Sequence, residues 1–405
     1  MNLLFAWRYF KGKKSTQAIN WIAWISTTAI VLITAAFILL LSVFNGFEGL
    51  VKSLYSSFYA DLKISSQQGS SFLLSPEKLR QIRELPGVKA CSGIVEQKAL
   101  LAHEDLQTIV YLKGVDDAYS LVSGVDEKLI RGSFQLGTQE QPAIVLGGGV
   151  ENILAVDVER SLLPLTLYVF QQGGVSGVTP TYVSESIRPS GTFFIQQDID
   201  GKYALTNIAS LRRMLNWSGQ QYSSLELAVS DPQQGEDMKG RLEKILGAGF
   251  RLDNRYQQNS SLYQVMRMEK WAIYLILTFM LGVAAFTLVG ALTMLVMEKQ
   301  KDIQVLKAMG SSSFRIQKIF LSLGLFLGVA GGVLGLLLGL VICWAQLQFK
   351  LVAIQGGTFL IDYYPVSVQA GDLIRVGITV IGVATLASWL PSVKAAQLPI
   401  QLKSL

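Results

Sequence analysis

Four stretches without charged residues constrain the fold of this 405-residue chain more than any other feature of its sequence. They span residues 15–47, 271–297, 319–349 and 376–393. Each reaches or approaches the ~20 apolar residues that cross a ~30 Å hydrocarbon core. The first is far longer than the apolar core of a signal peptide, and no small-residue cleavage site follows it, so we expect it to stay in the membrane. The chain is predicted to be a polytopic α-helical membrane protein with four transmembrane helices.

The short loops predict the orientation, because cytoplasmic loops of membrane proteins carry an excess of Lys and Arg. Lys350 and Arg375 are the only basic residues in the loop 350–375, so we expect this loop to lie outside. Basic residues gather in three other segments. The N-terminus has Arg8, Lys11, Lys13 and Lys14; the loop between the second and third spans has Lys299, Lys301, Lys307, Arg315 and Lys318; the C-terminal tail has Lys394 and Lys403. Both termini are therefore predicted to be cytoplasmic.

The basic balance of the chain comes from the segments that flank the membrane. Residues 48–270 contain 22 Lys and Arg against 25 Asp and Glu, whereas the rest contains 13 against 4. Positive charge beside the spans suits an anionic inner leaflet. A nucleic-acid-binding protein would concentrate its positive charge on one domain, so we expect no nucleic-acid partner.

The region between the first two spans shows two similar patterns of strand, helix and strand. In the first, "ADLKISS" precedes "SPEKLRQIREL", where Ser75 is the expected N-cap and Pro76 the first helical residue. In the second, "LELAVS" and "FRLDNRY" flank a helix with Met238, Leu242 and Leu246 aligned. These patterns predict a large α+β extracytoplasmic domain, split by an insertion at about 116–194.

Residues with catalytic or metal-binding chemistry are sparse. His103 is the only histidine, and "LAHEDLQ" predicts a hairpin turn in which its side chain is solvated. The run "LGGGVENIL" lacks the Gly-Lys-Ser/Thr ending of a phosphate-binding loop, so its glycines are expected to allow a tight turn. Cys91 and Cys343 fall in different parts of the chain and are not expected to pair. We therefore predict no catalytic residue, no metal and no cofactor in this chain.

The segment 296–321, "VMEKQKDIQVLKAMGSSSFRIQKIFL", places seven charges between residues 298 and 318, between two spans. Ile303, Leu306 and Met309 are expected near one helical face, with Gly310 as the C-terminal cap. Such a helix would project into the cytoplasm as a rigid knob that transmits force. The alternative is a simple helical connection whose positive charges fix the topology.

This segment resembles the cytoplasmic coupling segment of the type VII ABC permease superfamily, which includes MacB and FtsX. Within it, the chain resembles the LolC/LolE family of lipoprotein-releasing permeases. The matching pieces are "FAWRYFKGKK", "LSVFNGFEGLV", "NSSLYQVMRMEKWAIYLIL", "DYYPV" and "ASWLPSVKAAQLPIQLKSL". The second piece departs from the Met-Asn-Gly-Phe that is more frequent in the family. The pieces cover nearly the whole chain.

The resemblance implies a MacB-like periplasmic core domain between the first and second transmembrane helices. The expected segments are an interfacial helix at 1–19, a first transmembrane helix at 20–47 with an extension to about 60, the periplasmic domain at 61–262, a second helix at 268–297, the coupling helix and turn at 298–313, a third helix at 316–349, a periplasmic loop at 350–372, a fourth helix at 373–393 and a cytoplasmic tail at 394–405.

The resemblance also implies partners. A separate LolD-type ATPase dimer would bind ATP and Mg and contact the coupling segment at Glu298, Lys301, Asp302, Leu306, Met309 and Gly310. The chain itself would be a non-catalytic subunit in the bacterial inner membrane. It would extract acylated lipoproteins and pass them to a LolA-type periplasmic carrier. Its partner permease would be a second LolC/LolE-type chain or a second copy of itself, and the choice between LolC-type and LolE-type roles stays open.

The sequence suggests two further sites. Phe44, Phe47, Met266 and Trp271 are predicted to border a cleft for acyl chains, although helix packing would also explain these apolar residues. The loop at 171–184 lies roughly where LolC-like proteins dock their carrier, with Gln171, Val175, Pro180 and Tyr182 as candidate contacts. Its alternative role is a simple exposed connection.

Three other functions compete with lipoprotein release. MacB-like export of another substrate is disfavoured because MacB carries a fused N-terminal ATPase and this chain begins with its membrane-entering segment. FtsX-like signalling to a cell-wall hydrolase is disfavoured because FtsX-like proteins have a smaller outer domain. An integral-membrane enzyme is disfavoured because the sequence shows no set of catalytic residues.

Overall fold

The computed structural model describes residues 17–160, 163–171, 182–231, 235–247, 249–353 and 363–399. The chain forms two compact units, one of Met1–Leu50 with Gln264–Leu405 and the other of Val51–Tyr263. We call the first the helical unit and the second the outer unit. Of the interfacial helix expected at 1–19, residues 1–16 lie outside the described residues, and a long helix begins at Gln17.

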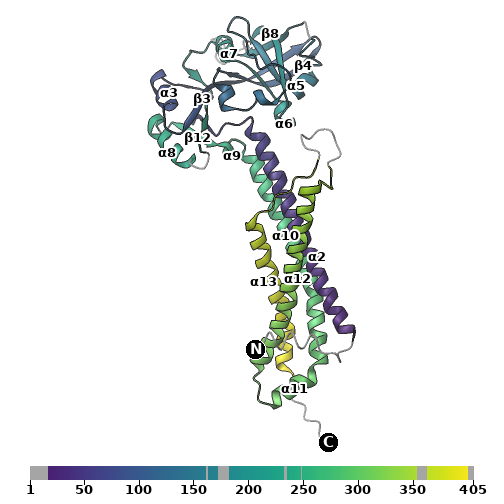
Figure 1. The fold of residues 1–405 in the computed structure, drawn as a ribbon. Coiled ribbons are helices and arrows are strands. Elements are labelled where there is room, and N and C mark those ends of the chain that lie inside the picture. Colours follow the sequence, from purple (N-terminus) through teal and green to yellow (C-terminus); the bar gives the residue numbers. More distant parts are fainter. Residues whose placement is uncertain are drawn as a thin grey trace. The chain divides into compact units, whose positions relative to one another are not determined.

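Four long helices form the helical unit, with a short helix at the end where the second ends and the third begins (Figure 1). Each is long and apolar enough to cross a membrane. At ~1.5 Å per residue, even the shortest exceeds a ~30 Å hydrocarbon core. The four are α2 (Gln17–Ser56), α10 (Ser260–Glu298), α12 (Ser313–Phe349) and α13 (Ala370–Gln397), and the short helix is α11 (Gln300–Ala308).

Glycines on α12 allow neighbouring helices to approach closely. One row of glycines faces α2 and another faces α13. A Cβ at Gly332, for example, would lie 2.7 Å from Val380 Cγ1, and one at Gly339 would lie 2.9 Å from Ile38 Cβ. Small residues at such contacts are the usual means of packing helices within lipid, where the hydrophobic effect gives no drive for association.

A ten-stranded sheet is the main element of the outer unit, in the order β12-β1-β11-β3-β4-β9-β6-β8-β5, with β7 pairing to β3 and β8. Its strands are β1 (Leu62–Ser66), β3 (Val88–His103), β4 (Leu106–Val115), β5 (Leu129–Gly132), β6 (Ala143–Gly147), β7 (Leu165–Phe170), β8 (Tyr182–Phe193), β9 (Tyr203–Asn207), β11 (Ser224–Val229) and β12 (Phe250–Asn254). A two-stranded sheet pairs β2 (Phe72–Leu73) with β10 (Gln221–Tyr222).

Part of this sheet closes on itself. The strands β3, β4, β9, β6, β8 and β7 form a circuit, because β7 returns to pair with β3 at Ala99–Ala102. The first half of β3 pairs instead with β11 and so joins the circuit to the open part of the sheet. The strands of the predicted insertion at 116–194 therefore belong to the same sheet as the rest of the unit.

The local predictions for the outer unit are confirmed at several elements. Helix α3 (Pro76–Arg83) begins with Pro76, and the Ser75 side chain accepts a hydrogen bond from the Lys78 N–H. Helix α8 (Gly235–Leu246) buries Met238, Leu242 and Leu246. Among the described residues, the other α-helices of the unit are α4 (Tyr119–Val122), α5 (Gly148–Ile153), α6 (Gln197–Asp200), α7 (Ile208–Leu215) and α9 (Arg255–Gln258), and η1 (Asp126–Lys128) is a 3-10 helix.

The expectation for His103 is wrong in one respect. The hairpin exists, since His103 pairs with Leu106 across the turn between β3 and β4. The imidazole, however, is half-buried, with Nδ1 3.1 Å from the Leu154 carbonyl. The glycines of "LGGGVENIL" do turn β6 into α5, and a Cβ at Gly149 would lie 2.8 Å from Gly201 Cα.

Candidate functional site: the coupling helix and the polar cluster of the helical unit

Helix α11 is set off by a break at each end. Its N-terminal neighbour, Lys299, separates it from α10. At its C-terminus Gly310 adopts φ +86°, a conformation that favours glycine. The Ser311 N–H then bonds the Leu306 carbonyl, and the Gly310 N–H bonds the Lys307 carbonyl, both at 3.0 Å. This pair of bonds is a Schellman motif, so the predicted cap at Gly310 is confirmed.

The inner side of α11 is fixed to the rest of the helical unit. Ile303 is buried in a cluster with Val296, Ile316, Phe320 and Ala395. Lys307 Nζ donates hydrogen bonds to the carbonyls of Ala396, at 2.8 Å, and Leu398, at 2.7 Å. These carbonyls lie at the end of α13, where the helix leaves them without intrahelical partners. Helix α11 is thus held against both α12 and α13.

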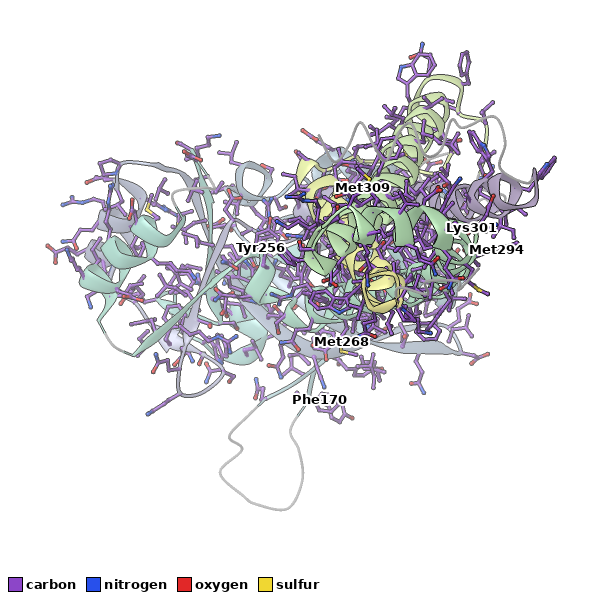
Figure 2. All side chains as sticks on the ribbon, turned by 90° about the horizontal axis from the view of Figure 1, so that it is seen from below. Phe170, Tyr256, Met268, Met294, Lys301 and Met309 are labelled. Carbon is purple, nitrogen blue, oxygen red and sulfur yellow. The ribbon has the colours of Figure 1, made fainter. Side chains whose placement is uncertain are left out.

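The outer side of α11 combines charge with exposed apolar surface. Lys301, Asp302 and Gly310 are exposed, and Met309 is 78% exposed. Figure 2 shows Lys301 and Met309 near the two ends of this helix. Glu298 and Leu306 are half-buried. Ile303 and Met309 were expected on one face but point apart, because they lie six residues apart and the helix ends before Met309.

Val305 and Phe314 extend the apolar surface of this end, at 58% and 63% exposure. We call Lys301, Asp302, Val305, Met309 and Phe314 the coupling surface. Sequence reasoning missed Val305 and Phe314. The signal that could have found Val305 is its spacing of four residues from both Lys301 and Met309. Phe314 follows Met309 by five residues, in a segment that lies outside the uncharged spans.

The four residues predicted to border a lipid cleft lie on α2 and α10. Phe44, Phe47 and Met266 are half-buried, and Trp271 is 72% exposed. The Phe47 ring packs edge-on against Tyr364 at 5.7 Å, and the Trp271 ring packs against Tyr274 at 6.0 Å. The aromatic rings are therefore fixed by neighbours within the helical unit, and their role toward acyl chains stays a prediction.

A polar cluster joins three of the long helices, and the sequence did not predict it. Asp372 on α13 is 5% exposed. Its carboxylate accepts a hydrogen bond from Asn45 Nδ2 on α2 at 2.7 Å and pairs with Lys270 Nζ on α10 at 3.2 Å. Lys270 also donates to Asn45 Oδ1 at 2.7 Å. Arg375, one turn along α13, reaches the other carboxylate oxygen at 3.1 Å.

The predicted carrier-docking loop is described only at its ends. Val175 and Pro180 lie outside the described residues. Strands β7 and β8 pair up to Phe170 and Tyr182, which face each other across the hairpin. Both side chains are exposed, at 43% and 61%, whereas Gln171 is held by a hydrogen bond to the Met214 carbonyl.

A second buried ion pair lies within the sheet of the outer unit. Lys113 Nζ lies 2.8 Å and 2.9 Å from the two carboxylate oxygens of Glu226, and 3.1 Å from the Tyr119 hydroxyl. Burial alone would lower the pKa of Lys113. The nearby Glu226 and Tyr119 raise it by a larger amount, so the pKa of Lys113 lies above its ordinary value. The ammonium also lies over the Phe58 ring at 4.9 Å.

Burial keeps two titratable side chains of the outer unit protonated at neutral pH. A cleft of about 570 Å³ is lined by polar residues and by Tyr59, Tyr111 and Tyr203. Burial raises the pKa of Tyr59 to about 12, which keeps its hydroxyl protonated. Burial likewise raises the pKa of the Cys91 thiol to about 12. In the described part of the chain, His, Cys, Asp and Glu form no cluster of three or more that could hold a metal ion.

Two known protein families match successive parts of this chain. Residues 23–245 match the MacB-like periplasmic core domain family. The chain belongs to that family. Residues 274–400 match the FtsX-like permease C-terminal family. The described helices and this domain confirm the coarse architecture predicted from the sequence.

Curated relatives of this member of the family are similar over almost its whole length. A lipoprotein-releasing system transmembrane protein LolC from Neisseria meningitidis is 28% identical over 97% of each chain. A LolE protein from Haemophilus influenzae is 25% identical over 98% of each chain. The solved periplasmic region of MacB from Actinobacillus actinomycetemcomitans is 13% identical, with a TM-score of 0.35, over 52% of this chain and 94% of that one. The predicted resemblance to LolC and LolE is confirmed.

Proposed function

We propose that this chain is the permease subunit of an ATP-driven ABC complex that extracts acylated lipoproteins from the inner membrane for delivery to the outer membrane. The observation that carries the proposal is the coupling surface, an exposed charged and apolar face on a helix fixed by Ile303 and Lys307. A surface of this composition on a rigid element is suited to a protein partner. The full-length similarity to LolC and LolE proteins supports lipoprotein release as the purpose.

A separate LolD-type ATPase dimer is the proposed partner at the coupling surface. ATP and Mg bind to that dimer, and this chain is non-catalytic. Met309 inserts into an apolar pocket of the ATPase, while Lys301 and Asp302 form rim contacts. Movement of the ATPase displaces α11, and the bonds of Lys307 to the end of α13 pass the displacement to that helix. Glu298, Leu306 and Gly310 support the surface.

The substrate is proposed to contact the outer ends of α2 and α10. Phe44, Phe47, Met266 and Trp271 present apolar side chains there, and each buried CH₂ group of an acyl chain gains about 0.8 kcal/mol. We expect Phe47→Glu to reduce lipoprotein release, because the new carboxylate would lie beside the acyl chains without a cation. Unchanged release by this variant, at normal abundance, would show that Phe47 does not line the path.

The rest of the proposed complex follows the same scheme. Both termini are cytoplasmic and the outer unit is periplasmic, in the bacterial inner membrane. A second LolC/LolE-type permease or a second copy of this chain completes the membrane part. A LolA-type carrier docks at the hairpin end formed by Phe170 and Tyr182, because an exposed aromatic pair is a frequent anchor of protein interfaces. Val175 and Pro180, which lie outside the described residues, are proposed to extend this site.

Depletion of the chain in its native host tests the proposal. Inner and outer membranes are separated, and acylated lipoproteins are followed in each. We expect lipoproteins to accumulate in the inner membrane, and Met309→Glu to reproduce this result. The matched control is Met268→Glu, the same substitution at an exposed methionine of α10, which should still co-purify with the ATPase. Normal lipoprotein sorting with a drug-sensitivity or division defect would instead favour MacB-like export or FtsX-like signalling.

A further inference from the structure

The carboxylate of Asp372 is the point at which three long helices are bonded together. Asp372 lies on α13. Its carboxylate accepts a hydrogen bond from Asn45 of α2 and forms an ion pair with Lys270 of α10. Lys270 and Asn45 also bond to each other, so the three side chains form a closed triangle. A triangle of this kind fixes each helix against the other two, which a single ion pair would not do.

The triangle lies far from the coupling surface. Lys270 is roughly 40 Å along α10 from Glu298, at ~1.5 Å per residue, which exceeds a ~30 Å hydrocarbon core. The polar groups therefore sit near the outer end of the spans. Ionisable residues within or beside spans are costly and are retained where they serve function. In the same region the Ser367 N–H bonds the Ser42 carbonyl, which fixes the segment before α13 to α2.

The orientation of Asn45 determines the orientation of its neighbours. Successive residues of an α-helix are turned by about 100°. Asn45 is 3% exposed and points into the helical unit, so Phe44 and Phe47 are turned to the other side of α2, where they are half-buried. On α10, Lys270 points toward Asp372 and its neighbour Trp271 is 72% exposed.

We propose that Asp372 is a positioning residue for the lipid-contacting face. Through Asn45 and Lys270 it fixes the rotation of α2 and α10, and thereby the direction of Phe44, Phe47 and Trp271. The inference rests on the proposed function, which assigns these apolar residues to acyl chains. Asp372 does not contact the lipoprotein; it acts through the two helices that do.

Two variants separate positioning from a general charge effect. Asp372→Asn removes the charge that holds Lys270 and Asn45 with little change in shape. Arg375→Gln is the matched control, since it removes a cation from the same carboxylate without breaking a bond between helices. Arg375 and Asp372 lie on the same helix, and the Arg375 side chain is 66% exposed.

The measurement uses the full complex in proteoliposomes and records ATP hydrolysis together with lipoprotein released to the carrier. We expect Asp372→Asn to lower the lipoprotein released per ATP about fivefold, with ATP hydrolysis changed less than about twofold. Arg375→Gln should change both by less than about twofold. An unchanged ratio in Asp372→Asn would overturn the inference, as would an equal loss in Arg375→Gln.

A charge swap guards against simple misfolding. Lys270→Asp with Asp372→Lys, in the Arg375→Gln background, restores an ion pair between α10 and α13. Asn45 fits either arrangement, because its amide has both a donor and an acceptor. We expect the swap to recover most of the release per ATP. If the swapped protein had normal abundance and thermal stability but did not recover release per ATP, the positioning role of Asp372 would be overturned.

A second readout does not depend on lipoprotein release. The variants Phe47→Cys and Trp271→Cys, each in a background with Cys91→Ala and Cys343→Ala, are labelled with a water-soluble maleimide. Asp372→Asn should change the labelling rate at both positions about threefold or more, and the swap should restore it. Altered labelling with no release by the wild-type complex would refute the proposed function but keep the positioning role. Identical labelling in all variants would refute the positioning role.

Discussion

The two units each bury a lysine–carboxylate pair, and the two pairs are built differently. In the outer unit, Lys113 and Glu226 are each 3% exposed at the side chain and stand on β4 and β11, strands of one sheet. In the helical unit, Lys270 is 21% exposed and Asp372 6%, and they stand on separate helices with Asn45 of a third. The first pair is enclosed within a sheet, whereas the second connects three separate helices.

We therefore expect the two ion pairs to have different roles, one in stability and one in the placement of helices. Removing one partner from a fully enclosed pair leaves an uncompensated charge, so the outer pair should affect the stability of its unit. The pair of the helical unit is less enclosed and has a second cation, Arg375, at the same carboxylate. Its loss should affect the relative positions of the helices more than their folding. The predictions below test this division, beginning with the largest expected effect.

Glu226→Ala should destabilise the outer unit by about 3–5 kcal/mol, because it leaves Lys113 charged and buried. Chemical unfolding of the full chain in detergent, followed by a probe in the outer unit, measures this effect. The control is Glu84→Ala, which breaks the exposed Arg80–Glu84 pair and should cost less than about 1 kcal/mol. A similar small cost for both variants would show that the enclosed pair is not a structural element.

Gly332→Leu should destabilise the helical unit by about 1–3 kcal/mol, because the added side chain meets Val380 on α13. The matched control is Gly282→Leu on α10, where an added Cβ meets no atom within 4 Å. Thermal unfolding in detergent compares the two. If both variants unfold alike, close packing of α12 on α13 does not hold the helical unit together.

Asp200 gives the outer unit a pH dependence that the enclosed ion pair does not. Burial raises its pKa from 3.8 to about 6, and the backbone N–H groups of Ile195 and Gln196 offset part of the rise. The folded protein then holds this proton more tightly than the unfolded chain, so the unfolding free energy should fall as pH rises from about 4 to 6. Asp200→Asn should remove this slope and add about 1–2 kcal/mol at pH 7. If the unfolding free energy of the variant still fell with pH at the same rate, other titratable groups would cause the pH dependence.

Gly310→Ala should have the smallest effect, about 1 kcal/mol, since alanine is strained at φ +86°. The change concerns only the turn after α11 and should appear as faster amide hydrogen exchange there. Gly290→Ala, within α10 and without atoms near an added Cβ, should leave this exchange unchanged. Equal exchange rates in both variants would mean that the Schellman motif does not fix the end of α11.

The sequence predicted the elements of this chain better than their contacts. The four spans, the Ser75 cap and the Gly310 cap depend on local patterns, and local patterns are visible in a sequence. The closure of the sheet was missed because the pairing of β7 with β3 joins residues more than sixty positions apart without a periodic signal. The Asp372 cluster was missed for the same reason, because Asn45 and Asp372 are 327 residues apart.

The residues predicted to contact the ATPase show the limit of reasoning from local sequence patterns. Charge and position between two spans identified Lys301 and Asp302, and both are exposed. The helical phase placed Ile303 and Met309 together, but the break after Ala308 turns Met309 outward while Ile303 is buried. Only the structure shows that Lys307, expected to be one more topology-setting cation, bonds two carbonyls at the end of α13.

ATP-dependent release of an acylated lipoprotein from proteoliposomes tests the central claim most directly. The wild-type chain and Met309→Glu are each reconstituted with the ATPase and partner permease, and soluble lipoprotein bound to the carrier is measured with and without ATP. We predict ATP-dependent release by the wild type and about a tenfold or greater loss with Met309→Glu, because the new carboxylate would be buried at the ATPase interface. No release by an intact wild-type complex, or equal release by both, would contradict the account.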